Sequence, residues 1–269
     1  MINKLINKKF SIAALLVVLC IGFSAHAAIK KEMVEYKDGD TTFEGQLVYD
    51  DAITGQRPGV LIIHQWMGLS DHEKGSAEKL AALGYVAFAA DVYGKGNLPK
   101  DMSEAGKFAT QLKSDTKLFR KREKAALDVL AKNKMVNKKQ LVVMGYCMGG
   151  TGALEAARAG LPVVGAVSFH GGLASAAPKD AKNIKGKLLV LHGAIDPNVP
   201  PAEVQGFMNE MNDAKVDYQF IAYSGAVHSF TQPAAGHDIK KGAAYNKVAA
   251  ERSWAALQTF LSEVAPIKK

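Results

Sequence analysis

The chain contains very little cysteine and few aromatic residues. Two of its 269 residues are cysteines, and 8% are aromatic. Cys20 lies in an N-terminal segment that we expect to be removed, which leaves Cys147 as the remaining thiol. One cysteine cannot form an internal disulfide, so a disulfide-stapled fold is excluded. Cys147 is then either a small buried apolar residue or a reactive group.

Residues 1–27 have the pattern of a secretory signal peptide. Three lysines precede an apolar stretch over 12–23, and Ala25-His26-Ala27 supplies the small residues of a cleavage site. We expect cleavage after Ala27 and export to the periplasm or the medium. A retained membrane anchor is the alternative, but the stretch is shorter than the roughly 20 residues of a membrane span. Stable membrane insertion is therefore not expected.

The sequence has a modest excess of positive charge. The formal charge of +8 falls to +5 when the three lysines of residues 1–27 are removed. The remaining basic residues are interleaved with acids and lack an aromatic stacking pattern, so nucleic acid is not an expected partner. We interpret the basic run 120–124 as the solvent face of a helix whose apolar side is Ala126, Val129 and Leu130.

Strand-like and helix-like patterns alternate along the chain, which predicts the α/β class. From the third predicted strand onward the strands are continuous apolar runs, typical of a mostly parallel sheet with helices on both faces. The first two predicted strands form an antiparallel hairpin at the edge. Because the chain has no repeat or low-complexity tract, residues 28–269 are predicted to form one domain. Strands are predicted at 33–37, 44–50, 58–64, 85–90, 140–145, 163–169, 187–192 and 217–223, and helices at 71–84, 117–132, 150–159, 201–213 and 244–264.

Cys147 lies in a motif typical of a nucleophile. The sequence Gly145-Tyr146-Cys147-Met148-Gly149 follows an apolar strand and precedes a helical pattern. Glycines two positions before and after a nucleophile permit a strained turn that exposes its side chain. The helix N-terminus would lower the pKa of the thiol, and the backbone N–H of Met148 could donate to a developing oxyanion.

Two later residues complete the pattern of a catalytic triad. Asp196 and His228 each follow a predicted strand, in the order nucleophile, acid, histidine. His228 would exchange protons with the nucleophile and the leaving group, and Asp196 would fix its tautomer. Asp91 is an alternative acid, although it precedes the nucleophile in the chain.

With these motifs the chain resembles the dienelactone hydrolase family of α/β-hydrolases. The resemblance runs from "GVLIIHQWMGLSDH" through "ADVYG", "GYCMGG" and "LHGAIDPNVP" to "VHSF". It implies an α/β-hydrolase fold with a mostly parallel central sheet of about eight strands and helices on both faces. It also implies that Cys147, Asp196 and His228 form the triad. The backbone N–H groups of Trp66 and Met148 would form the oxyanion hole.

Three positions depart from the pattern that the resemblance implies. The family usually has a glutamate where this chain has Gln65, and two arginines where it has Lys95 and Gln232. A neutral amide cannot take a proton from the thiol, so activation would rest on His228 and the helix terminus. One lysine is a poor substitute for a bidentate pair of arginines. Dienelactone itself is therefore not the expected substrate.

The predicted substrate pocket and the remaining histidines are less specific. The pocket is predicted from Gln65, Tyr93, Lys95, Phe230 and Gln232. Trp66, Tyr93 and Phe230 could equally be core residues. His64, His170 and His192 share no metal-ligand spacing, so we interpret them as structural or pocket-wall residues and expect no metal and no cofactor.

Together these observations predict a carboxylic-ester hydrolase. Cys147 would attack a small-molecule ester, lactone or thioester and form an acyl-enzyme that water then hydrolyses. We expect a monomer. The alternative is a non-hydrolytic binding or redox-thiol protein that keeps the fold and uses Cys147 as an oxidisable group.

Overall fold

Eight strands form one sheet in the order β1-β2-β4-β3-β5-β6-β7-β8. The computed structural model describes residues 28–267, so the predicted signal peptide lies outside the described residues. Strand β2 pairs antiparallel with β1 and β4, and the other strands pair in parallel. The mostly parallel sheet and the edge hairpin predicted from the sequence are confirmed. The strands are β1 (Ile29–Asp38), β2 (Thr41–Asp50), β3 (Arg57–Ile63), β4 (Val86–Ala90), β5 (Val136–Tyr146), β6 (Gly165–Phe169), β7 (Lys187–Gly193) and β8 (Tyr218–Tyr223).

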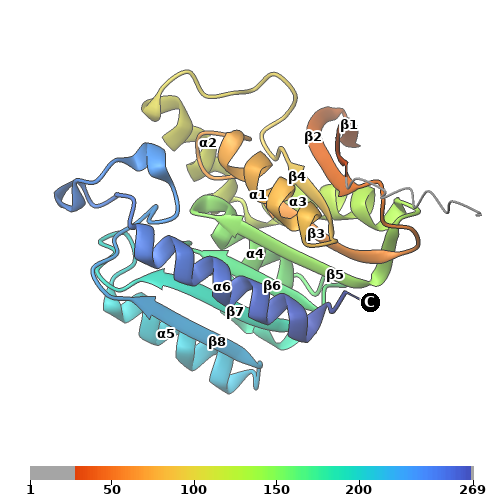
Figure 1. Ribbon diagram of the computed structural model, residues 1–269. Helices are drawn as coiled ribbons and strands as arrows, with labels where there is room; N and C mark the ends of the chain where they lie inside the picture. The colour runs from red at the N-terminus through yellow and green to blue at the C-terminus, as the bar shows by residue number, and fades with distance from the viewer. Residues whose placement is uncertain (1–27, 268–269) are drawn as a thin grey trace, which may run out of the picture.

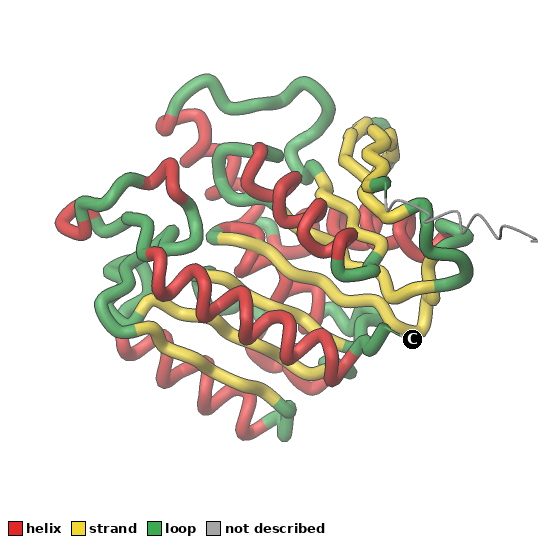
Figure 2. Tube along the Cα trace, in the orientation of Figure 1, coloured by secondary structure: helices red, strands yellow, loops and turns green. Residues whose placement is uncertain are grey.

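Helices cover both faces of the sheet. In Figures 1 and 2, α1 and α6 cross the face nearest the viewer, and α3, α4 and α5 cover the opposite face. The longer helices are α1 (Asp71–Ala82), α2 (Met102–Ser114), α3 (Thr116–Lys132), α4 (Met148–Arg158), α5 (Pro201–Asp213) and α6 (Lys247–Val264). Short 3-10 helices span Pro178–Asn183, Pro233–Ala235 and Ile239–Lys241. Within residues 28–267, no helix is long and apolar enough to span a bilayer.

The apolar strands divide the core into two layers. In β3, Val60 and Ile62 pack in the layer that contains the α1 and α6 side chains. Leu61 and Ile63 pack in the other layer, with side chains from α3, α4 and α5. Because successive side chains of a strand point to opposite faces, a strand covered on both sides is apolar throughout. This explains the continuous apolar runs in the sequence.

Helix α2 was not predicted from the sequence. Its only buried residues are Ala105 and Leu112, so its apolar face is narrow. Asp101 caps its start by accepting the Glu104 N–H at 2.9 Å. Strand β5 also begins at Val136, earlier than predicted, through the polar residues 137–140. Both errors occur where burial is too sparse to leave a periodic pattern.

The prediction that the run 120–124 faces solvent is wrong for three of its residues, one of which, Arg122, is partly buried and donates to the Val92 carbonyl at 2.6 Å. Glu123 is fully buried, and neither carboxylate oxygen has a hydrogen-bond partner among the described residues. Burial, together with the charge of Glu155, raises the pKa of Glu123 well above its usual value. Arg120 binds Glu155 at 2.7 Å. Lys121 and Lys124 are exposed, as expected.

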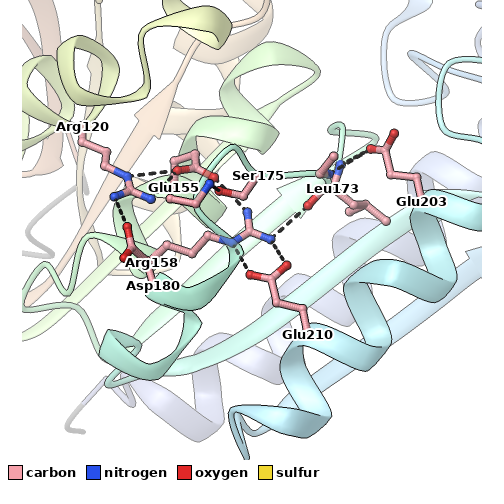
Figure 3. Close-up of polar contacts among 10 residues, drawn as sticks. Arg120, Glu155, Arg158, Leu173, Ser175, Asp180, Glu203 and Glu210 are labelled. Atoms are coloured by element: carbon pink, nitrogen blue, oxygen red, sulfur yellow. Dashed lines mark hydrogen bonds and ion pairs between the residues drawn. The ribbon is translucent and has the colours of Figure 1, made fainter.

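A buried arginine ties α4 and α5 to the segment that follows β6. The Arg158 guanidinium is fully buried and donates to Glu155 at 3.0 Å, to both Glu210 oxygens at 2.8 Å and to the Leu173 carbonyl at 2.9 Å. The Glu203 carboxylate accepts the backbone N–H of Leu173 at 2.5 Å and that of the next residue at 3.0 Å. Figure 3 shows Glu155 and Glu210 around the Arg158 guanidinium, and Arg158 and Glu203 in contact with the Leu173 backbone. The network therefore fixes a loop at the carboxyl end of the sheet.

We expect Arg158→Met to reduce the free energy of unfolding by about 3–5 kcal/mol, because it leaves the partly buried Glu210 without its cation and leaves the buried Glu155 with Arg120 alone. Urea denaturation followed by circular dichroism measures this. Lys124→Met is the matched control, since it removes an exposed i,i+4 pair with Asp128 and should barely move the midpoint. Equal midpoints for the two variants would contradict the assigned role of Arg158.

Candidate active site

The turn between β5 and α4 holds Cys147 in a strained backbone conformation. Its φ of 54° and ψ of −115° lie outside the regions that non-glycine residues usually adopt. A β-carbon on Gly145 would lie 2.1 Å from the Gly149 carbonyl oxygen, and one on Gly149 would lie 2.2 Å from the Ile63 carbonyl oxygen. Both glycines are therefore required by close backbone packing. The turn leaves the Cys147 side chain partly exposed at the start of α4.

Three loops at the carboxyl ends of parallel strands bring the predicted triad together. Asp196 lies between β7 and α5, and His228 lies in the long loop after β8, drawn in blue at the left of Figure 1. His228 Nε2 is 3.0 Å from Cys147 Sγ, and His228 Nδ1 is 2.8 Å from Asp196 Oδ2. Asp91 instead accepts the backbone N–H groups of Tyr93 and of the following glycine.

The electrostatics of this cluster favour a charged thiolate and imidazolium. Burial opposes ionisation of Cys147, but hydrogen bonding to His228, the charge of His228, the Met148 N–H and the charge of Lys113 together lower its pKa. For His228, burial lowers the pKa, but hydrogen bonds to Asp196 and Cys147 and the charges of both raise it to about 10. The thiolate is lost as pH falls through the lowered Cys147 pKa, and the imidazolium is lost as pH rises through about 10.

Two backbone N–H groups, those of Met148 and Trp66, are the candidates for binding a substrate oxygen. The Met148 N–H lies in the first turn of α4, directly after Cys147, and it helps to lower the pKa of that thiol. On the facing loop, the N–H groups of Gln65 and Met67 are bound by side-chain oxygens. The intervening Trp66 N–H has no acceptor within the described part of the chain.

Tyr93 connects the loops that carry these two N–H groups. Its hydroxyl donates to the Trp66 carbonyl at 2.8 Å and lies 3.3 Å from the Met148 sulfur. Burial, the Cys147 charge and Asp91 raise the pKa of Tyr93, so its hydroxyl keeps its proton. Tyr93 thereby links the Trp66 backbone to the Met148 side chain.

Two of the predicted pocket residues make contacts that serve the fold. Lys95 forms ion pairs with Glu35 and Glu44 on the β1–β2 hairpin, the second at 2.9 Å. Phe230 is fully buried, and its ring packs 5.2 Å from the His170 ring. These contacts favour a structural ion pair for Lys95 rather than a substrate clamp. They favour a core position for Phe230 rather than a place in the pocket wall.

The other predicted pocket residues are two glutamines. Gln65 is buried, and its side-chain oxygen accepts the Met67 N–H at 3.1 Å, so it shapes the loop that carries Trp66. Gln232 is partly buried in the turn after His228, where its backbone N–H donates to the Ser229 carbonyl at 2.9 Å.

The strand-end histidines differ in role. His64 is fully buried, accepts the Val92 N–H at 3.1 Å and lies 2.6 Å from the Gln65 carbonyl oxygen, which makes it structural. His192 is buried and faces the Phe220 ring. His170 contacts the backbone of Cys147, a contact that the sequence does not predict. No group of three or more His, Cys, Asp or Glu side chains among residues 28–267 is arranged to hold a metal ion.

Comparison with known proteins identifies relatives over most of the chain. The sequence profile of the "Dienelactone hydrolase family" matches residues 43–265. The solved structure of m3DLH is 40% identical, with a TM-score of 0.85, over 88% of this chain and 99% of that one. The dienelactone hydrolase-like promiscuous phosphotriesterase P91, from metagenomic libraries, is 38% identical with a TM-score of 0.84 over the same shares. A probable 2-oxo-3-(5-oxofuran-2-ylidene)propanoate lactonase from Bradyrhizobium is 28% identical over 82% of this chain and 90% of its own length.

We expect Cys147 to react with iodoacetamide at a pH where an ordinary thiol is protonated. Its alkylation rate should have a midpoint below about 8.5, the reference pKa of a free cysteine. His228→Gln should move the midpoint above that value, because burial would then act without the imidazolium. Mass spectrometry of timed samples measures the rate. An unchanged midpoint in the variant would contradict the ion pair.

Proposed function

The chain belongs to the dienelactone hydrolase family and is a hydrolase that acts on ester bonds, and we propose that it does so with Cys147 as its nucleophile. The supporting observation is the continuous contact from Asp196 through His228 to the Cys147 sulfur, at 2.8 and 3.0 Å. In this arrangement each ring nitrogen of His228 has one partner. The acid orients the ring, and the ring faces the nucleophile.

The first half of the proposed reaction forms an acyl-enzyme. The Cys147 thiolate attacks the carbonyl carbon, a C–S bond forms, and the carbonyl π electrons move to oxygen. The N–H groups of Trp66 and Met148 would stabilise that oxyanion. When the carbonyl re-forms, the C–O bond of the ester breaks, and protonated His228 donates its proton to the leaving alkoxide.

The second half releases the acid. In the acyl-enzyme the thiolate charge and its hydrogen bond to His228 are gone, and both of these raise the His228 pKa in the free enzyme. The pKa of His228 therefore falls, so the neutral imidazole can take a proton from water. The resulting hydroxide attacks the thioester carbon, and the C–S bond breaks to restore the thiolate and imidazolium.

We propose that the natural substrates are esters, lactones or thioesters without a carboxylate that must be clamped. Lys95, the cation at one expected clamp position, is already paired with Glu35 and Glu44. The relative from Bradyrhizobium is named as a lactonase, which favours the lactone class.

A phosphotriester is a second candidate substrate, supported by the 38% identity to P91 over nearly all of that protein. The thiolate would attack phosphorus as it attacks a carbonyl carbon, and the N–H groups of Trp66 and Met148 would bind the phosphoryl oxygen. Whether the enzyme turns over with such a substrate depends on how fast water cleaves the resulting S–P bond.

We expect the reduced protein, residues 28–269, to hydrolyse short aryl esters, aryl thioesters, small lactones or an aryl phosphotriester. Cys147→Ala should lower kcat about 10³-fold or more, because the covalent route is lost. His228→Gln should lose turnover as well, whereas a redox thiol would keep much of its oxidation chemistry without an oriented histidine. Initial rates in a spectrophotometric assay measure both. Equal rates for wild type and Cys147→Ala would favour the binding or redox alternative.

We also propose that residues 1–27 direct export and are then removed, on the basis of their sequence pattern alone. Expression of the full chain in a Gram-negative host should give mature protein in the periplasmic fraction with Ala28 as its first residue. N-terminal sequencing of each fraction tests this. Uncleaved chain in the membrane fraction would instead support the anchor alternative.

A further inference from the structure

His170 contacts the nucleophile turn through one of its ring nitrogens. It follows β6 directly, is 2% exposed and adopts a left-handed backbone conformation with φ of 41°. The Cys147 N–H points at two acceptors, the Phe169 carbonyl at 3.0 Å and His170 Nδ1 at 3.2 Å. Because Nδ1 accepts this hydrogen bond, the ring proton of neutral His170 must be on Nε2.

The other ring nitrogen contacts the loop that carries His228. His170 Nε2 lies 2.8 Å from the Thr231 hydroxyl oxygen and donates its proton to it. Thr231 Oγ1 lies 3.4 Å from His72 Nε2, at the start of α1. One chain of polar contacts therefore joins the Cys147 turn, the histidine loop and the helix that follows the Trp66 loop.

The surroundings of His170 hold its ring in place and uncharged. The His228 and Phe230 rings pack edge-on against it, each with a centroid separation of 5.2 Å. Burial, followed by the charges of His228 and His72, lowers the pKa of His170 well below its usual value. A protonated ring would present an N–H to the Cys147 N–H, so the observed contact requires the neutral form.

We propose that His170 is a positioning residue that fixes the Cys147 turn relative to the His228 loop, so that Cys147 Sγ and His228 Nε2 stay in hydrogen-bond contact. The proposal rests on the function assigned above to these two side chains. His170 is 23 residues from Cys147 and 61 residues from Thr231 in the chain, and it contacts each of them through a different ring nitrogen.

The test is the pH dependence of Cys147 alkylation by iodoacetamide, which needs no substrate. His170→Phe removes both polar contacts, and Thr231→Val removes the hydroxyl while keeping the side-chain shape. We expect each to raise the alkylation midpoint by about one pH unit, which is a tenfold loss of rate below the midpoint. The charged and titratable groups that act on Cys147 or His170 are His228, His72, His192, Lys113 and Tyr93, and neither substitution removes any of them.

Conservative variants separate the two contacts. Asn in place of His170 puts an oxygen near the position of Nδ1 and tolerates a positive φ, so it keeps the contact to Cys147 and loses that to Thr231. His170→Asn should therefore give a midpoint between those of wild type and His170→Phe. Thr231→Ser keeps the hydroxyl, so its alkylation midpoint should lie close to that of the wild type and not at the raised value expected for Thr231→Val.

A stability control distinguishes positioning from general damage. Leu257→Ala truncates a fully buried side chain of α6, so it should lower the urea midpoint and leave the alkylation midpoint unchanged. If His170→Phe lowers the urea midpoint but does not move the alkylation midpoint, the proposal is overturned. Failure of the hydrolase assignment would appear differently, as absent turnover in wild type with the alkylation shifts intact.

Discussion

The close approach of the first turn of α4 to the end of β3 is the constraint on which the site depends. At Gly149 a β-carbon would lie 2.2 Å from the Ile63 carbonyl oxygen, so the two backbones pack without a side chain between them. This contact places Cys147 at a helix N-terminus and next to the loop that carries Trp66. The strained φ of Cys147 is maintained because the sheet, α4 and the β6 loop all restrict the turn.

The charge state of Cys147 follows from a balance between burial and hydrogen bonding. Burial alone would keep the thiol neutral, so the lowered pKa depends on His228 and on the Met148 N–H. His228 in turn depends on Asp196, whose carboxylate is fully buried and directed at Nδ1. Gln65 takes no part in this balance, since its side chain binds the Met67 N–H. The pair is therefore activated by contacts among three loops, and a shift in any loop would weaken it.

The sequence predicts the parts of this protein that depend on periodic burial or on a fixed motif. Apolar runs such as 58–64 predict the parallel sheet, and the glycines around Cys147 predict the turn. Helix α2 and the burial of Glu123 were not predictable, because the first has two buried residues and the second breaks the expected polar face. The pairing of Lys95 with Glu35 and Glu44, and the contact of His170 with Cys147, join residues distant in the chain. Such contacts depend on strand order and loop geometry, which no local pattern encodes.

The most direct test of the covalent mechanism is to trap the intermediate. The reduced protein would be mixed with an aryl ester that turns over, quenched in acid within the first turnovers, and digested for mass spectrometry. We predict that the peptide containing Cys147 carries the acyl mass, and that this adduct disappears once the substrate is exhausted. Steady turnover with no acyl group on Cys147 at any time point would contradict the covalent mechanism.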